Sequence, residues 1–172
     1  MRVAITGTPG TGKTTASSLL EPRLEGYDVI HLNEVLEREG LYTEVDEERD
    51  SKVADLDALA AWLEGRKDVL VESHLAHHFE VDRVAVLRCE PSQLENRLRN
   101  RGESTAKAQE NAESEALDVV LAEAVDIHGQ ESVYEIDTTD RDPEAVADDL
   151  EAVVRGDREP SAGTVDFVGY LA

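Results

Sequence analysis

The sequence predicts an α/β fold in which five parallel strands form one sheet between two layers of helices. Short apolar runs alternate along the chain with segments of helical length, an order typical of a parallel sheet. The run Arg83–Arg88 is nearly continuously apolar, as expected for a strand buried on both faces. A glycine-rich turn at Gly7–Thr14 joins the first apolar run to the first helical segment. In such a fold the ligand lies outside the carboxyl ends of the strands.

The five strands are predicted from short apolar runs bounded by polar or turn residues. They are Arg2–Thr6, Asp28–Leu32, Asp68–Ser73, Arg83–Arg88 and Ser132–Ile136. Caps and periodicity place the helices between them. Pro22 disrupts the first helix, Asn33 is expected to be the N-cap of the second, and Gly40 ends it. The predicted helices span about Lys13–Leu20, Glu34–Glu39, Asp55–Gly65, Ser92–Arg101, Ala106–Ile127 and Pro143–Arg155.

Some segments do not fit this alternation. Leu41–Lys52 is polar, acidic and aperiodic, so we expect an exposed segment there. The stretches Asn33–Lys52 and Gly102–Glu115 are too long for simple connections, and such excursions are often functional lids or binding loops. The C-terminal tail, residues 156–172, ends in an apolar run that either packs on the body or serves an interface.

The chain is strongly acidic. It has 172 residues, which predicts a single domain (1–172), with 17 Lys+Arg and 39 Asp+Glu, so the formal net charge is 17 − 39 = −22. Only four of the basic residues are lysines. Scarce lysine with acid spread over the whole chain resembles proteins of salt-loving archaea, in which concentrated salt screens carboxylate repulsion. We favour this interpretation over an acidic patch that selects a basic partner.

Composition also limits the compartment and the partners. No apolar stretch approaches the ~20 residues of a membrane span, and the N-terminus leads directly into a strand rather than a signal segment. Cys89 is the only cysteine, so neither an intrachain disulfide nor a cysteine-built metal site is expected. No basic patch with interleaved aromatics is present. We therefore expect a cytoplasmic protein with no membrane partner and no direct nucleic-acid partner.

The turn Gly7–Thr14 reads GTPGTGKT, which fits the phosphate-binding pattern GxxxxGK[ST] between a strand and a helix. Glycines such as Gly10 and Gly12 let successive backbone N–H groups point at phosphate oxygens, and the first helical turn adds further donors. Lys13 is expected to reach the β- and γ-phosphates, and the Thr14 hydroxyl to help hold Mg²⁺. The chain is therefore predicted to bind a nucleoside triphosphate with Mg²⁺.

The remaining motifs favour phosphoryl transfer. A GTPase is disfavoured because no Asn-Lys-x-Asp element follows a later strand, and a motor or transporter ATPase usually needs a longer chain. Four arginines fall within fourteen residues of this acidic chain: Arg88, Arg97, Arg99 and Arg101. Arg101 stands beside Gly102, where a lid could carry it over the phosphates. Arg99 is instead expected to pair with Glu95 on the helix surface.

Two polar side chains emerge at the carboxyl end of the third strand. Glu72 could hold an Mg²⁺-bound water or orient the attacking group, and His74 could position a water or an acceptor oxygen. Alternatively, His74, His77 and His78 could bind a transition metal. The absence of a nearby cysteine and the loop-like setting disfavour that alternative.

Several motifs occur in an order that resembles a known family. They are Gly7–Thr15 (GTPGTGKTT), Asn33-Glu34 with Arg38, Leu41-Tyr42 followed by Asp46-Glu47-Glu48-Arg49-Asp50-Ser51, Glu72-Ser73-His74, Arg97-Leu98-x-x-Arg101-Gly102 and Lys107-x-x-Glu110-Asn111-x-x-x-Glu115. From Met1 to about Arg155 the chain is similar to the small adenylate-kinase-like ATPases of the adenylate kinase 6 type, which also act in small-ribosomal-subunit maturation. The acidic stretch and the KxxEN element are the most particular of these motifs.

The resemblance implies a P-loop NMP-kinase-like three-layer sandwich with a five-stranded parallel sheet, a monophosphate-binding insertion (33–52) and a short lid (101–112). The implied activity is ATP + AMP = 2 ADP, with broad acceptance of monophosphates and slow ATP hydrolysis. The implied catalytic residues are Lys13, Arg101, Glu72 and His74, with Thr14 and Glu72 near the metal. ATP would be bound by Gly10, Thr11, Gly12, Lys13, Thr14, Thr15 and Arg101, and the monophosphate by Asn33 and Arg38.

Two departures from the family pattern affect this expectation. Glu72 stands where the family often has Asp, and Glu103 stands where an aromatic residue commonly follows the lid glycine, so we expect a shifted magnesium shell and weaker lid contacts. The family also implies a protein partner, the S-eleven-type protein of the small subunit, and a role in 16S rRNA maturation. The alternative is an assembly-factor ATPase whose nucleotide cycle gates release of a ribosomal protein, with phosphotransfer incidental. A kinase for another small metabolite also stays open, because the loop cannot name the acceptor.

Overall fold

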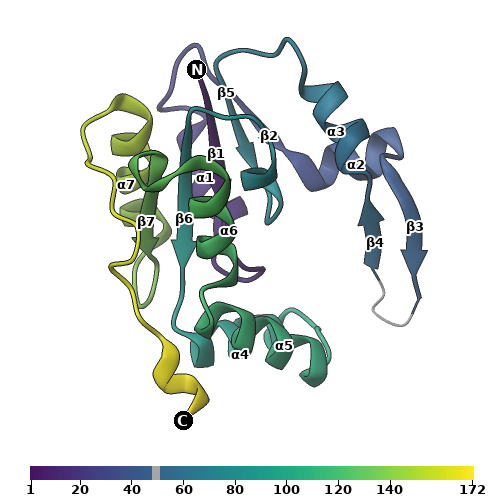
Figure 1. Cartoon of the computed structure of the whole chain (residues 1–172), viewed down its shortest axis with the longest axis vertical. Coiled ribbons are helices and arrows are strands. Elements are labelled where there is room, and N and C mark those ends of the chain that lie inside the picture. Colours follow the sequence, from purple (N-terminus) through teal and green to yellow (C-terminus); the bar gives the residue numbers. More distant parts are fainter. Residues whose placement is uncertain (48–50) are drawn as a thin grey trace.

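The computed structural model describes residues 1–47 and 51–172, and its centre is a five-stranded parallel sheet. The strands lie in the order β2-β5-β1-β6-β7, so β1 is flanked by β5 and β6 (Figure 1). Their bounds are β1 Arg2–Thr6, β2 Asp28–His31, β5 Val69–Glu72, β6 Arg83–Arg88 and β7 Val133–Asp137. The five predicted strands are confirmed, with ends that shift by at most one residue.

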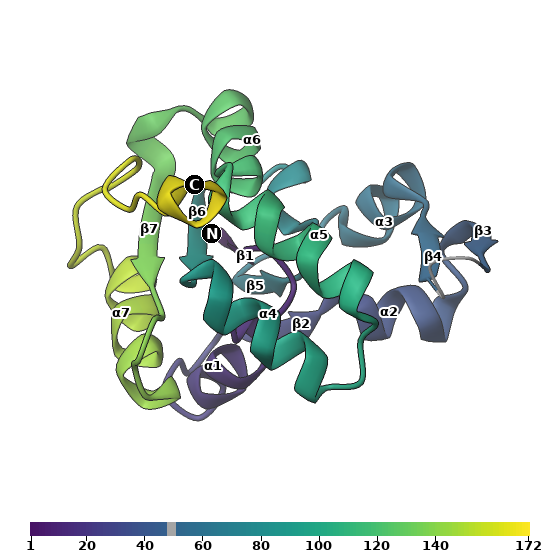
Figure 2. The ribbon, with the colours of Figure 1, turned by 90° about the horizontal axis from the view of Figure 1, so that it is seen from below.

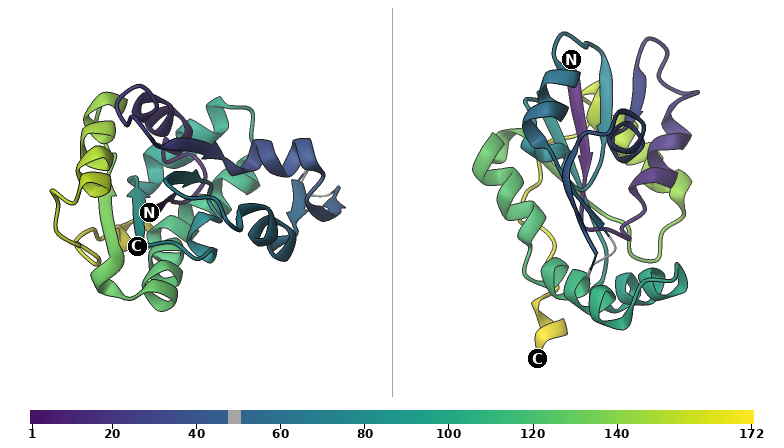
Figure 3. Two further views of the ribbon diagram at one scale, coloured as in Figure 1. Left: turned by 90° about the horizontal axis from the view of Figure 1, so that it is seen from above. Right: turned by 90° about the vertical axis from the view of Figure 1, so that its right-hand side faces the viewer.

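Helices cover both faces of the sheet and complete three layers (Figure 3). On one face, α1 and α7 pack on strand residues such as Ile5 and Leu87. On the other face, α2, α3 and α6 pack on residues such as Val71 and Val86. The bounds of these helices are α1 Lys13–Leu20, α2 Leu32–Glu39, α3 Leu56–Leu63, α6 Val119–His128 and α7 Pro143–Arg155. None of the described helices combines the length and the apolar composition that crossing a membrane requires.

A smaller apolar cluster lies beyond the carboxyl ends of the strands, where α4 (Pro91–Asn100) packs on α5 (Thr105–Ala116). Tyr170, from the C-terminal turn η3 (Val168–Leu171), packs against this cluster, and its hydroxyl donates a hydrogen bond to Glu95 at 3.0 Å. Figure 2 shows the C-terminal turn lying against these helices. Of the two roles considered for the tail, packing on the body is the one seen here.

The long helix predicted over Ala106–Ile127 is wrong, because α5 ends at Ala116 and α6 begins at Val119. The break is at Asp118, which has a φ of 57°. This left-handed conformation interrupts the helical hydrogen bonds, and the Asp118 carboxylate accepts a hydrogen bond from the buried Arg88 guanidinium. A tertiary contact therefore determines where the helix ends.

The region predicted only as an exposed segment contains regular structure. β3 (Tyr42–Asp46) and β4 (Ser51–Ala54) form an antiparallel hairpin that extends away from the sheet (Figure 1). We call this hairpin the arm. Its polar sequence lacks strand periodicity because both faces meet solvent over much of its length. Glu48, Arg49 and Asp50 of the acidic motif lie outside the described residues.

The N-cap predicted at Asn33 is also wrong. Helix α2 begins at Leu32, so His31 occupies the N-cap position. The Asn33 side chain instead accepts a hydrogen bond from the Ser73 hydroxyl at 3.2 Å, which ties α2 to the segment that follows β5. Gly40 ends α2 as predicted, with a left-handed φ of 67°.

Candidate active site

The phosphate loop connects β1 to α1 at the carboxyl edge of the sheet, and two of its glycines are required by geometry. Gly7 has a φ of 148°, and a Cβ there would lie 2.6 Å from the carbonyl oxygen of Leu87. Gly12 has a φ of 93° immediately before α1. Neither conformation suits a residue with a side chain. The loop can therefore approach β6 closely and turn sharply into the helix.

Thr8 is the centre of the hydrogen bonds within the loop. Its carbonyl oxygen accepts from Lys13 Nζ at 3.1 Å and from Thr11 Oγ1 at 2.9 Å. Lys13 is buried. Burial lowers the pKa of its ammonium group to about 8. The negative charge of Glu72 partly opposes this shift, and the positive charge of Arg101 adds to it. Hydrogen bonds to the Thr8 carbonyl thus close the loop on itself.

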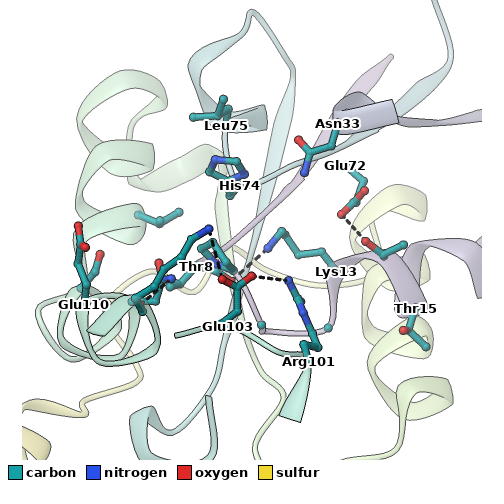
Figure 4. Close-up of a pocket in the computed structure, with 18 of the residues that line it drawn as sticks. Thr8, Lys13, Thr15, Asn33, Glu72, His74, Leu75, Arg101, Glu103 and Glu110 are labelled. Carbon is teal, nitrogen blue, oxygen red and sulfur yellow. Dashed lines mark hydrogen bonds and ion pairs between the residues drawn. The ribbon is translucent and has the colours of Figure 1, made fainter. Parts of the chain in front are cut away.

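A cavity of about 660 Å³ opens beside the loop. This volume is within the range of small-ligand sites. Its lining includes Thr8, Gly10, Gly12, Lys13, Thr14, Thr15, Asn33, Lys52, Glu72, His74, Arg101, Glu103, Lys107 and Asn111. In Figure 4, Lys13, Arg101 and Glu103 point toward one part of the cavity, with Glu72 and His74 farther along its wall. The structure thus brings together most of the residues that the sequence singled out.

Glu72 is held at the sheet edge by two partners. Its Oε1 accepts from the Thr14 hydroxyl at 3.0 Å, and its Oε2 lies 3.0 Å from His31 Nδ1. His31 is the register partner of Glu72 on the neighbouring strand β2. The extra methylene of Glu72 therefore leaves the carboxylate in contact with Thr14. The predicted metal ligands Thr14 and Glu72 lie together, and hydroxyl and carboxylate oxygens are the donors that suit Mg²⁺.

His74 lines the same cavity one turn beyond β5. Burial lowers the pKa of His74 to about 4, and the nearby charge of Lys13 contributes a smaller part of this shift. Its ring is therefore neutral at physiological pH. A neutral imidazole can donate one hydrogen bond and accept another, so His74 is suited to orienting a water or a hydroxyl group rather than to supplying positive charge.

Arg101 follows α4, and Glu103 lies close to it. The Arg101 side chain is 59% exposed, and its Nη2 lies 3.9 Å from the Glu103 carboxylate. Glu103 also pairs with Lys107 at 3.3 Å. One carboxylate thus stands between two cationic side chains at the cavity, at the position where the family pattern commonly has an aromatic residue.

A second cavity, of about 510 Å³, lies on the other side of the loop. It shares Gly10, Gly12, Thr15 and Arg101 with the first and also includes Thr11, Ala16, Arg97, Thr138, Arg141, Pro143 and Val146. Thr138, Arg141 and Pro143 follow the last strand of the sheet and were not predicted as site residues. The signal that could have found them is their place at the carboxyl end of a parallel strand. Arg101 stands where the two cavities meet.

Two of the clustered arginines do not serve the cavity. Arg88 is fully buried and is neutralised by Glu115, Asp118 and Glu135. Counting it among phosphate-facing cations from sequence was wrong, because its carboxylate partners come from distant parts of the chain. Arg99 pairs with Glu95 at 3.8 Å, as predicted.

Arg38 lies apart from the other predicted residues. Its side chain is 61% exposed and pairs with the neighbouring Glu39 at 3.2 Å. In the described part of the chain, neither cavity lining includes it. Its assignment to the monophosphate stays a prediction that requires α2 or the Arg38 side chain to move.

Of the three histidines considered as metal ligands, two lie together: the ligand atoms of His77, His78 and Glu123 are all within 4.8 Å of one another. His77 Nε2 lies 2.7 Å from Glu123 Oε2, and its Nδ1 lies 2.7 Å from the Thr6 hydroxyl. His78 lies 3.4 Å from the same Glu123 oxygen, and His74 is not part of this group. Two ligands of one tetrahedral zinc ion would be about 3.3 Å apart. The contact of 2.7 Å is a direct hydrogen bond, so the cluster is a hydrogen-bonded network in this structure.

Relatives and solved structures match this chain over nearly its full length. Residues 3–118 match a family described as an AAA domain. Curated relatives carry the name "Putative adenylate kinase": that of Natronomonas pharaonis is 64% identical over 99% of this chain and 100% of its own length, and that of Halobacterium salinarum is 59% identical with the same coverage. That of Methanocaldococcus jannaschii is 41% identical over 97% of this chain and 93% of its own length.

Among solved structures, shikimate kinase from Bacteroides thetaiotaomicron superimposes with a TM-score of 0.58 at 18% identity, covering 90% of this chain and 98% of that chain. Deoxyadenosine kinase from M. mycoides gives a TM-score of 0.55 at 14% identity, with coverage of 91% and 100%. These likenesses show the P-loop kinase fold. With the sequence matches, they show that the chain belongs to the archaeal adenylate-kinase-like family of P-loop proteins that these relatives represent.

Proposed function

We propose that the protein is a nucleoside monophosphate kinase that catalyses ATP + AMP = 2 ADP. The observation that carries this proposal is the pair of cavities that meet across the phosphate loop at Arg101. A kinase that joins two nucleotides needs space on both sides of the transferred phosphoryl group and fixed positive charge between them. The name of the curated relatives supports the same reaction class.

ATP is proposed to bind across the loop. Its base and ribose would enter the smaller cavity between Arg97, Pro143 and Val146, which offers apolar surface beside a planar guanidinium. Its phosphates would follow the N–H groups of Gly10–Thr15 into the larger cavity. Lys13 would then exchange its bond with the Thr8 carbonyl for the β- and γ-phosphates.

Transfer is proposed to depend on charge and position. Lys13 and Arg101 would stabilise the charge that spreads over the phosphoryl oxygens in the transition state. Thr14 and Glu72 would hold Mg²⁺, which neutralises phosphate charge when bound. Neutral His74 would orient the acceptor oxygen or exclude water from it.

The acceptor is proposed to enter the larger cavity from the side of the arm. Asn33 and Lys52 line that side. Acceptance of several monophosphates is proposed from the family resemblance. A kinase for another small metabolite is less favoured, because shikimate kinase and deoxyadenosine kinase share only the fold at this level of identity.

ATP hydrolysis and ribosome assembly form the second candidate. The family resemblance supports an ATPase whose cycle gates release of a basic ribosomal protein of the S-eleven type during 16S rRNA maturation. The exposure of Arg101 favours this candidate to a limited extent, because an open lid admits water to the transferred phosphoryl group.

The two candidates are separated by measuring ADP formation from ATP with and without AMP, in molar KCl to screen the acidic surface. We expect AMP to increase ADP formation strongly, and Lys13→Ala to abolish most of the increase. If AMP has no effect while a basic ribosomal protein accelerates hydrolysis, the assembly ATPase is correct. The same assay with CMP, GMP and UMP measures the breadth of acceptance.

A further inference from the structure

A buried ionic cluster lies directly behind the phosphate loop. Arg88, at the end of β6, is surrounded by the carboxylates of Glu115 on α5 and Glu135 on β7. All three side chains are almost completely buried. Buried ions are costly to desolvate, so each carboxylate in such a cluster needs specific partners. The two glutamates differ in which partners they have.

Glu135 is directed at Arg88 and at the C-terminal tail. Its Oε2 accepts from Arg88 Nη1 at 2.6 Å. Its Oε1 accepts from the Thr164 hydroxyl at 3.0 Å and from the backbone N–H groups of Thr164 and Val165 at 2.7 and 3.2 Å. Among the described residues, the hydrogen-bond partners of this carboxylate are Arg88, Thr164 and Val165, none of which belongs to the phosphate loop. Glu135 therefore neutralises Arg88 and anchors the tail.

Glu115 is directed at the loop instead. Its Oε1 accepts from the Thr8 hydroxyl at 3.1 Å, and its Oε2 accepts from the backbone N–H of Cys89 at 2.8 Å. Arg88 Nε is 3.3 Å from the carboxylate but makes no hydrogen bond within the described structure. A carboxylate present only to neutralise Arg88 would take the hydrogen-bonding position that Glu135 takes. The oxygens of Glu115 are used to join Thr8 to the start of the β6–α4 connection.

The hydrogen bond between Glu115 and Thr8 matters for the loop because Thr8 also holds other loop residues. The hydroxyl of Thr8 is bound to Glu115, while its carbonyl accepts from Lys13 and Thr11. Tethering the side chain restrains the position of Thr8, and with it the carbonyl that holds Lys13 and Thr11.

We propose that Glu115 is a positioning residue that holds the phosphate loop in its nucleotide-binding conformation through the Thr8 hydroxyl. The inference rests on the proposed function only in that the loop binds a triphosphate. It assigns to Glu115 a role distinct from that of Glu135, although both are buried partners of the same arginine.

The test compares Glu115→Gln with Glu135→Gln in the full chain. Glutamine keeps the shape but offers one acceptor oxygen in place of two, so in Glu115→Gln the charge-assisted bond to either Thr8 or Cys89 is lost, and at Thr8 only a neutral bond from the amide to the hydroxyl can replace it. By calorimetry with Mg²⁺ in molar KCl, we expect the Kd for ATP to rise about tenfold, the usual size of a lost charge-assisted hydrogen bond. For Glu135→Gln we expect a Kd within about twofold of wild type, because no loop contact is lost.

Thermal unfolding in the same salt separates positioning from folding. Both glutamine variants should lower the Tm by similar amounts, because each removes one buried charge beside Arg88. A raised Kd for ATP in Glu115→Gln alone therefore cannot come from lost stability. Equal rises in the two variants, or no rise in either, would overturn the proposal.

A double-mutant cycle tests whether Glu115 affects ATP binding through the Thr8 hydroxyl. Thr8→Val removes the hydroxyl and keeps the shape, and we expect it to raise the Kd for ATP about as much as Glu115→Gln does. The double variant should then be no worse than either single variant. Additive losses would show that Glu115 does not act through Thr8. The exposed Glu113→Gln, on the same helix, is the control for removal of one charge.

The readout also distinguishes this inference from the kinase proposal. Binding of ATP needs no acceptor, so a protein that binds ATP but ignores AMP would refute the kinase while leaving the Glu115 test intact. A wild-type protein that binds no ATP would overturn both.

Discussion

The phosphate loop and the arm border the same cavity, but they are held in very different ways. The loop is fixed by buried hydrogen bonds that involve Thr8, Lys13 and Glu115. Beyond its base, where Tyr42 and Ala54 pack against the core, the arm is held to the body by an exposed ion pair between Lys52 and Glu37. Exposed contacts of this kind contribute little individually. The triphosphate side of the site is therefore preformed, whereas the acceptor side can adjust at low energetic cost.

The largest expected effect lies on the preformed side. Lys13→Ala removes the buried ammonium group that we propose faces the transferred phosphate, and we expect turnover to fall ~10²-fold or more, as for other preorganised charges. The measurement is steady-state ADP formation in molar KCl, with circular dichroism to show that the variant folds. A folded variant with near-normal turnover would remove Lys13 from the catalytic assignment.

Arg101→Ala tests the junction of the two cavities. Its side chain is 59% exposed, so under the proposed mechanism it would contribute little to ground-state binding and most to the transition state. We expect kcat to fall ~10-fold or more while the Kd for ATP changes by a smaller factor. Comparing kcat with the calorimetric Kd distinguishes this from a simple clamp, for which affinity alone would weaken. Arg99→Ala is the matched control on the same helix.

The lowered pKa of Lys13 gives the loop a pH dependence. Bound phosphates favour the ammonium form and so raise its pKa, whereas in the free protein that pKa is about 8. Below pH 8 the lysine is charged in both the free and the ATP-bound protein, so the affinity for ATP is at its maximum. Above pH 8 binding must take up a proton, so affinity falls, by at most ~tenfold per pH unit. Calorimetry at pH 9 in buffers of different ionisation enthalpy would detect the proton uptake; no uptake would contradict the lowered pKa.

The same contrast explains how much the sequence could predict. The strands and the phosphate loop are marked by local patterns, so the loop, Glu72 and His74 could be placed at one sheet edge from sequence, whereas the order of the strands could not be predicted. Arg88 was misread because its three carboxylate partners lie 27 to 47 residues away along the chain. The arm was missed because a solvent-exposed hairpin needs no apolar alternation. Local chemistry is readable from sequence, whereas neutralisation by distant residues is not.

Arg38→Ala sharpens the comparison on the adjustable side. Arg38 faces solvent here, so it can contact a monophosphate only if α2 and the arm shift toward the cavity. We expect the KM for AMP to rise about fivefold, as for loss of one exposed ion pair that becomes desolvated on binding, with the Kd for ATP unchanged. An unchanged KM for AMP would show that Arg38 stays on the surface and that the acceptor is held by other residues.

The smallest expected effect is a gain. Glu103 pairs with Arg101 and Lys107 at the cavity, so its carboxylate competes with phosphate for both cations. Glu103→Gln removes that competition and should lower the Kd for ATP. The pairs are partly exposed and screened by molar salt, so we expect a change of about twofold in molar KCl and a larger one in dilute buffer. Calorimetry at two salt concentrations measures this, with Glu113→Gln as the control for net charge. A weakened affinity would instead mean that Glu103 organises the lid, so that the departure from the family pattern serves binding rather than opposing it.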